Sequence, residues 1–136
     1  MALLEKWLFI KRSSLPKAGL GLYTKKFIPK GAFIAEYKGK IRTWKEVNFL
    51  HCDNRYIFYV NRNKVIDALG YKKSFARYTN DAEGLKKIKG ITNNADFIDD
   101  NGRIYIEATK DILPGQEIFV SYGKEYWKTI KQNGEL

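Results

Sequence analysis

The sequence predicts a mainly β fold with eight to ten short strands and two or three short helices. Short runs of β-branched and aromatic residues are separated by turn residues, which is typical of strands joined by turns. Strand and helix patterns do not alternate, so a parallel sheet with crossover helices is not expected, and no internal repeat is present. A length of 136 residues, with 44% hydrophobic and 29% charged residues, predicts one globular domain over residues 1–136.

The first strands surround a glycine motif. Residues 6–12, which are apolar from Trp7 to Ile10, predict a strand, and residues 13–17, with Pro16, predict the loop after it. Gly19-Leu20-Gly21 then leads into a strand that ends near residue 25. Glycines serve turns and bulges, but they also let the backbone come within contact of a ligand. No further GxxG and no helix start follow, which argues against a dinucleotide-binding fingerprint.

The middle of the chain contains several short strands and two short helices. Thr43 and Glu46 fit a capping box, which predicts a helix over residues 44–50. Residues 56–60 carry aromatic side chains on both faces of a strand, so one face is expected to line something apolar. The other expected elements are a turn at 28–31, strands at 32–37, 40–42 and 64–67, and a short helix near 71–75.

The stretch 77–94 is the least regular part of the chain. It is polar, and a loop of this length inside a compact domain is more often functional than idle. Residues 95–98 and 103–108 then predict a hairpin, because Asn101-Gly102 is a strong signal for a tight turn.

The last predicted strand, residues 118–120, follows the turn Leu113-Pro114-Gly115 and ends at Ser121. Tyr122 is therefore placed at the end of a buried strand, with its hydroxyl free to face a cavity. A tyrosine at such a place is commonly structural. Tyr126 and Trp127 follow at helical distance, however, and three aromatic rings within six residues favour a site.

Composition excludes several classes of protein. Cys52 and His51 are the single residues of their kinds, which excludes an internal disulfide and any familiar zinc site, so no metal is expected. The cysteine content favours a reducing compartment, the cytoplasm, with the nucleus or a host cell as alternatives. Residues 1–11 read as a strand rather than a signal peptide, and no apolar run approaches the roughly 18 residues that cross a bilayer, so no membrane partner is expected.

The formal net charge of +10 predicts attraction to polyanions. The lysines are scattered and arginine is scarce beside them, so we expect nonspecific nucleic-acid attraction through the surface rather than reading of bases.

Four segments, in order and at their spacing, resemble the SET domain of protein-lysine methyltransferases. The resemblance covers residues 15–127 and leaves 128–136 as a polar tail. The segments are Gly19-Leu20-Gly21 before Tyr23; Glu36-Tyr37-Lys38-Gly39; Arg77-Tyr78-Thr79-Asn80 with Asn94-Ala95; and Gly115-Gln116-Glu117-Ile118 with Ser121-Tyr122-Gly123.

The resemblance implies a fold of small curved sheets with a knot-like core, S-adenosylmethionine as cofactor and a lysine-bearing protein as substrate. It implies a catalytic role for Tyr122, with Tyr56 beside the lysine. Phe97 and Val120 would limit the number of methyl groups added, and the lack of a tyrosine at these two positions favours di- or trimethylation. The substrate channel it implies is formed by Tyr56, Phe97, Val120 and Tyr126, and the cofactor-binding residues are Lys17, Gly19, Leu20, Gly21, Arg77, Asn80, Asp81 and Trp127.

Two departures from the family pattern stand out. The third motif of the family continues Asn-His-Ser, whereas Asn80 is here followed by Asp81-Ala82, and a carboxylate cannot stack as imidazole does. The family's cysteine-rich zinc-binding flanks are absent from this sequence, which is similar to the compact viral and bacterial members.

Two other functions stay open beside methylation. A SET fold with weak catalysis would act as a basic module that binds protein or nucleic acid, and an all-β nucleic-acid binder would stack bases on aromatic side chains. A histone substrate is itself basic, so Asp96, Asp99 and Asp100 are candidates for an acidic groove or, equally, for the solvated end of a hairpin. The chain is expected to be a monomer or a homodimer.

Overall fold

The computed structural model describes residues 3–16, 18–43, 45, 57–61, 63–68, 70–71, 74–83 and 89–122. Within these ranges the chain forms nine strands and two short 3-10 helices. In chain order they are η1 (Glu5–Trp7), β1 (Leu8–Arg12), β2 (Leu20–Thr24), β3 (Phe33–Glu36), β4 (Lys40–Arg42), β5 (Ile57–Asn61), β6 (Lys64–Asp67), η2 (Phe75–Tyr78), β7 (Ala95–Asp100), β8 (Arg103–Ala108) and β9 (Glu117–Ile118).

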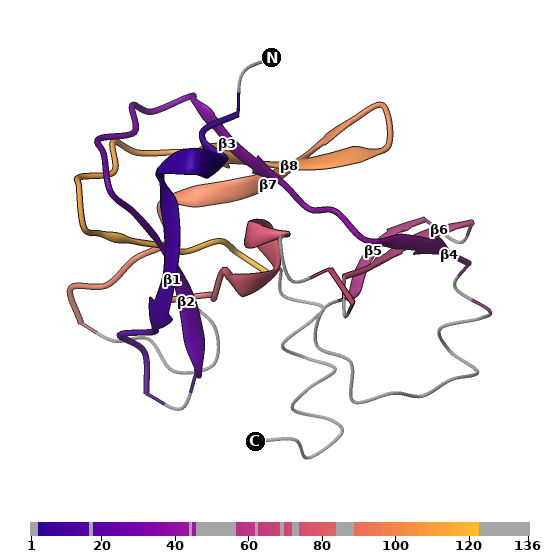
Figure 1. Cartoon of the computed structure of the whole chain (residues 1–136), viewed down its shortest axis with the longest axis horizontal. Helices are drawn as coiled ribbons and strands as arrows, with labels where there is room; N and C mark the ends of the chain where they lie inside the picture. Colours follow the sequence, from indigo (N-terminus) through magenta and orange to yellow (C-terminus); the bar gives the residue numbers. More distant parts are fainter. Residues whose placement is uncertain are drawn as a thin grey trace.

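The strands form three antiparallel sheets of three strands each, in the orders β1-β2-β9, β3-β8-β7 and β4-β6-β5. Figure 1 shows the first sheet at one end of the molecule, the third at the other, and η2 between them. The predicted mainly β fold is confirmed. Among the described residues, no helix is long and apolar enough to span a bilayer.

The predicted hairpin between β7 and β8 is confirmed. Asn101 and Gly102 have φ angles of 53° and 84°, the left-handed values that a tight two-residue hairpin turn requires. The Asp99 carboxylate accepts the N–H of Gly102 at 2.8 Å. Strand β7 continues to Asp100, two residues further than predicted, because Asp100 still pairs with Arg103.

The structure corrects two sequence-based boundaries. Residues 5–7 were expected to be extended, but they form η1, in which the N–H of Trp7 returns to the carbonyl of Leu4 at 2.9 Å. The helix expected near 71–75 begins only at Phe75. Ser74 is tied elsewhere, because its hydroxyl accepts the N–H of Lys38 at 2.9 Å. The helix expected over 44–50 falls almost wholly outside the described residues.

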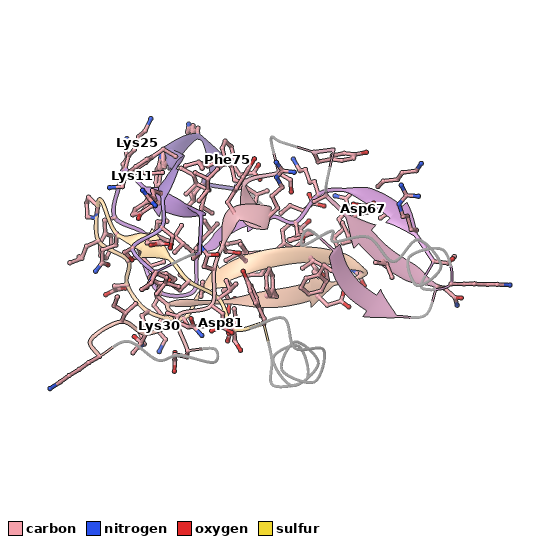
Figure 2. All side chains as sticks on the ribbon, turned by 90° about the horizontal axis from the view of Figure 1, so that it is seen from below. Lys11, Lys25, Lys30, Asp67, Phe75 and Asp81 are labelled. Carbon is pink, nitrogen blue, oxygen red and sulfur yellow. The ribbon has the colours of Figure 1, made fainter. Side chains whose placement is uncertain are left out.

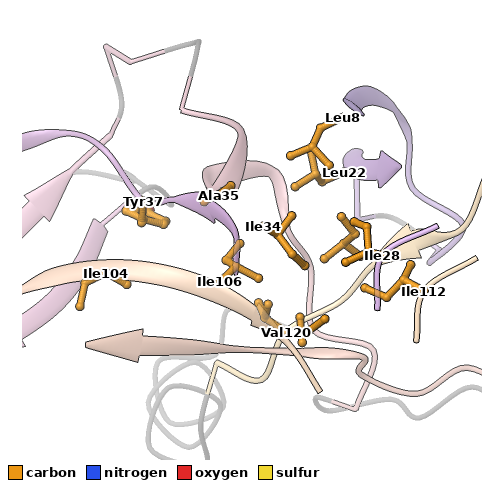
Figure 3. Close-up of a cluster of buried hydrophobic side chains, with 14 of the residues drawn as sticks. Leu8, Leu22, Ile28, Ile34, Ala35, Tyr37, Ile104, Ile106, Ile112 and Val120 are labelled. Carbon is orange, nitrogen blue, oxygen red and sulfur yellow. The ribbon is translucent and has the colours of Figure 1, made fainter. Parts of the chain in front are cut away.

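One hydrophobic core joins the sheets. Figure 3 shows side chains from β1, β2, β3 and β8 meeting around Ile34, with Ile28 and Ile112 at one edge. Ile28 and Ile112 form an isolated antiparallel bridge with two hydrogen bonds of 2.8 Å. The fully buried large aliphatic side chains are Leu22, Ile28, Ile34, Ile104, Ile106, Ile112, Ile118, Val65 and Val120. This core fixes the loop ends that carry the candidate site.

Candidate active site

The segment that follows β9 changes its partners along its length. Glu117 and Ile118 pair with β2, whereas Phe119 forms a parallel bridge with Asn80, and Val120 forms one with Ala95. The N–H of Val120 donates to the Asn80 carbonyl at 2.9 Å. The strand predicted at 118–120 is therefore real, but it passes between two chain segments that are distant in sequence. This passage brings Tyr122 beside residues 79–81.

Residues 79–81 bind both the side-chain hydroxyl and the backbone N–H of Tyr122. Its hydroxyl donates a hydrogen bond to the carbonyl of Thr79, and its backbone N–H donates to Oδ2 of Asp81 at 2.9 Å. Its ring is partly buried against the core. The prediction of a free hydroxyl was wrong, because the hydroxyl donates its proton to the Thr79 carbonyl and can act toward another group only as an acceptor.

The glycine motif presents open backbone at its first residue. Gly19 has a φ of +74° with open space where a side chain would project, and Leu20 is 53% exposed. The Asn80 amide nitrogen donates to the Leu20 carbonyl at 2.9 Å, which joins this motif to the segment beside Tyr122. A surface of exposed backbone next to an amide side chain is thus built from two distant motifs.

Gly21 faces a protein side chain instead. A Cβ at this position would lie 2.2 Å from Oε2 of Glu117. A glycine was expected here to let the backbone approach a ligand, but at Gly21 the backbone approaches the Glu117 carboxylate instead.

The buried carboxylate of Glu117 accepts several hydrogen bonds. The sequence did not identify it as a site residue, although it lies within the fourth motif that resembles the family. It is 6% exposed and accepts hydrogen bonds from the Ser13 hydroxyl at 2.6 Å, the Ser14 hydroxyl at 2.8 Å and the Ser14 N–H at 2.9 Å. Burial, followed by the charge of Glu117, raises the pKa of Tyr23, whose hydroxyl donates to the Arg12 carbonyl at 2.7 Å. This network anchors β9, and hence the segment that leads to Tyr122.

Arg77, a predicted cofactor contact, donates within the protein. Its guanidinium reaches the Ala68 carbonyl at 2.8 Å and the Tyr78 hydroxyl at 2.6 Å, and it lies 4.6 Å from the Tyr78 ring centroid. These contacts tie η2 to the end of β6. They orient the segment that continues into Thr79 and Asn80.

The predicted channel residue Phe97 belongs to an aromatic cluster. Its ring centroid lies 4.7 Å from that of Phe58 and 6.1 Å from that of Tyr37. Ala95 and Val120 form a parallel bridge. Phe97 follows Ala95 by two residues, and Tyr122 follows Val120 by two residues. Val120 itself is fully buried in the core. The structure therefore brings Phe97 and Tyr122 to the same end of the core.

The acidic residues of β7 are divided between its two faces. Asp96 and Asp100 are exposed and, by strand alternation, point away from the face that carries Phe97. Asp99 holds the hairpin turn. An acidic groove beside Phe97 is thus not formed by all three residues, and their second interpretation, as a solvated hairpin end, accounts for Asp99.

Four predicted site residues, Lys17, Tyr56, Tyr126 and Trp127, lie outside the described residues, so their roles stay predictions.

The three small sheets, with a C-terminal segment inserted between Asn80 and Ala95, have the architecture of a SET fold. The methyltransferase domain of human PR domain-containing protein 2 superposes with a TM-score of 0.65 at 27% identity, over 86% of this chain and 77% of that one.

The family model of the SET domain matches residues 19–123, and the chain belongs to this family. Histone-lysine N-methyltransferase set-17 of Caenorhabditis elegans is 30% identical over an alignment of 125 residues, with coverage of 86% of this chain and 41% of that protein. Histone-lysine N-methyltransferase EZ1 of Zea mays is 27% identical over an alignment of 115 residues, with coverage of 79% of this chain and 12% of that protein. The chain therefore spans less than half the length of either relative.

Proposed function

We propose that this protein is a protein-lysine methyltransferase that moves a methyl group from S-adenosylmethionine to the side-chain amine of a lysine. The observation that carries the proposal is the fixed placement of Tyr122, whose hydroxyl donates to Thr79 and whose main chain is held by Asp81. Membership of the SET domain family supports the reaction class.

The residues present fit the proposed cofactor. The amide oxygen of Asn80 accepts no hydrogen bond from the part of the chain that the structure describes, while its nitrogen is fixed on Leu20. An acceptor oxygen beside the open backbone of Gly19 suits the ammonium group of an amino-acid moiety. We therefore propose Gly19, Leu20 and Asn80 as cofactor contacts. When bound, S-adenosylmethionine supplies an electrophilic methyl group on a positive sulfonium.

Lysine must lose its proton before its amine can attack. With an ordinary pKa near 10.4, freeing the amine at pH 7.5 takes about 4 kcal/mol. An apolar surrounding lowers the pKa of a buried lysine because it disfavours the charged form. The aromatic cluster of Tyr37, Phe58 and Phe97 offers such surroundings at the end of the core where Tyr122 lies.

Tyr122 would orient the neutral amine. Because its proton is used on Thr79, the phenolic oxygen can only accept, and an amine N–H directed at it leaves the nitrogen lone pair free for attack. This is catalysis by positioning, and it needs neither a strong base nor a metal.

The substrate class that we propose is a basic protein such as a histone. Both curated relatives carry the name histone-lysine N-methyltransferase, which supports this choice.

Transfer of label from S-adenosylmethionine to a panel of purified histones tests the proposal, with wild type beside Tyr122→Phe. The variant keeps the ring that packs on the core and removes only the hydroxyl, so we expect calorimetric cofactor affinity to persist and transfer to fall about 100-fold. Tyr71→Phe removes the hydroxyl of a tyrosine that is 47% exposed and serves as the matched control. Cofactor binding without transfer by the wild type would favour the binding-module alternative, and loss of both would refute the assignment.

A further inference from the structure

The carboxylate of Asp81 joins three chain segments. Oδ2 accepts the backbone N–H of Tyr122, and Oδ1 accepts both the N–H of Glu83 and the side-chain amide of Asn93, each at 2.9 Å. Figure 2 shows Asp81 near the start of β7. The turn at residues 81–83, the approach to β7 and the Tyr122 main chain therefore all meet on one side chain.

This carboxylate extends the pairing that holds the segment before it. The N–H of Val120 donates to the Asn80 carbonyl, so a continued parallel ladder would direct the N–H of Tyr122 to the carbonyl of residue 82. The chain turns at Ala82 instead. The Asp81 side chain receives the Tyr122 N–H in place of that carbonyl.

Tyr122 donates two hydrogen bonds to the two residues that flank Asn80 in the sequence. Thr79 accepts the hydroxyl, and Asp81 accepts the main-chain N–H. A shift of the main chain at Tyr122 would move the phenolic oxygen with it, because the ring has only two rotatable bonds of its own. Holding the N–H therefore also holds the hydroxyl in register with Thr79.

We propose that Asp81 is a positioning residue for Tyr122, which explains why a carboxylate follows Asn80 in this chain. The inference rests on the proposed function. A carboxylate has two acceptor oxygens, and that of Asp81 accepts from Tyr122, Glu83 and Asn93 in the described part of the chain. An amide has one acceptor oxygen, and a neutral imidazole has one acceptor nitrogen. Asp81 thus acts on catalysis through Tyr122, without touching the reacting atoms.

Steady-state kinetics of Asp81→Asn tests this, with S-adenosylmethionine and the histone that the wild type labels. We expect kcat to fall at least 10-fold, with the Kd for S-adenosylmethionine and the KM for histone within about twofold of wild type. Glu83→Gln is the matched control, because Glu83 lies in the same turn and accepts the Asn93 N–H at 2.8 Å. It should keep the wild-type kcat.

A second measurement reads the contact itself. In protein labelled with ¹⁵N-tyrosine, the amide resonance of Tyr122, assigned by its loss in Tyr122→Phe, should shift in Asp81→Asn and stay in place in Glu83→Gln. A merely structural role would lower the melting temperature of Asp81→Asn without changing kcat below it.

A folded Asp81→Asn with the kcat of the wild type overturns the proposal. So does a loss of cofactor affinity with an unchanged kcat at saturation, which would assign Asp81 to the cofactor. If Asp81→Asn does not fold, Asp81→Glu keeps the charge and moves it by one methylene; it should lower kcat, and an unchanged kcat would again refute the idea. A wild type that transfers no methyl group removes the proposed function as well, which separates the two failures.

Discussion

Gly21 and Glu117 fit against each other so closely that a side chain on Gly21 would force the carboxylate to move: a Cβ on Gly21 would lie 2.2 Å from Oε2 of Glu117. The carboxylate in turn binds Ser13 and Ser14, so the loop after β1 and the start of β9 are joined across the glycine. The glycine motif is thus partly a packing device for the strand that leads to Tyr122.

Gly21→Ala is therefore expected to destabilise the protein by about 3 kcal/mol, because the methyl group displaces a buried carboxylate from its hydrogen bonds. Urea unfolding measures the change. Gly70→Ala is the control: the site has open space and no left-handed φ, so the variant should be neutral or up to about 1 kcal/mol more stable. Equal losses in the two variants would contradict the role assigned to Glu117.

Tyr23 links stability to alkaline pH. Its pKa in the folded state is raised by burial and by the charge of Glu117, whereas the unfolded chain has the ordinary value near 10. The folded state therefore holds this proton more tightly, so its stabilisation is complete below pH 10 and is lost as pH rises through the folded pKa. We expect Tyr23→Phe to reduce the fall of the urea midpoint above pH 10. Tyr71→Phe, at an exposed tyrosine, should leave that fall unchanged.

The side-chain amide of Asn94 makes two hydrogen bonds to the main chain of residues 117–119, as the backbone of a paired strand would. Its amide nitrogen donates to the Glu117 carbonyl, and its amide oxygen accepts the Phe119 N–H, both at 2.9 Å. Asn94→Ala should cost about 2 kcal/mol, since two main-chain groups lose their partner. The exposed neighbour Thr92 offers a control, because Thr92→Ala should change the free energy of unfolding by less than about 0.5 kcal/mol. Similar values for the two variants would show that water replaces the amide.

Phe97→Tyr tests how many methyl groups the site adds. On the proposed function, a hydroxyl added to the Phe97 ring would occupy room beside the amine and hold it or a water in one orientation. Mass spectrometry of the labelled histone should then show a shift from di- and trimethyl toward monomethyl lysine. Phe33→Tyr, at a partly buried ring on β3 that packs at a tilted angle against Tyr105, controls for a general effect of the added hydroxyl. An unchanged product distribution would remove Phe97 from the channel.

The strand content and the tight hairpin followed from local signals. Alternating or apolar runs bounded by turn residues locate β1, β7 and β8, since those signals lie within a few residues of each other. The order of four motifs led to the family, because their residue types and spacing are carried by the chain itself. Local patterns predicted the start of the second helical turn less well. The hydroxyl of Ser74, just before this turn, accepts the N–H of Lys38, a residue 36 positions away.

The sequence by itself thus determined the fold class and the family, and it identified Tyr122 as the candidate catalytic residue. Only the tertiary structure decided which groups surround that tyrosine, because Thr79, Asp81 and Tyr122 meet through the insertion of one segment between two others. It also decided that Gly21 accommodates Glu117 and that the Asp81 carboxylate accepts a main-chain hydrogen bond. Contacts between residues 41 and 104 positions apart depend on how the whole chain packs, and no local pattern in a single sequence encodes that packing.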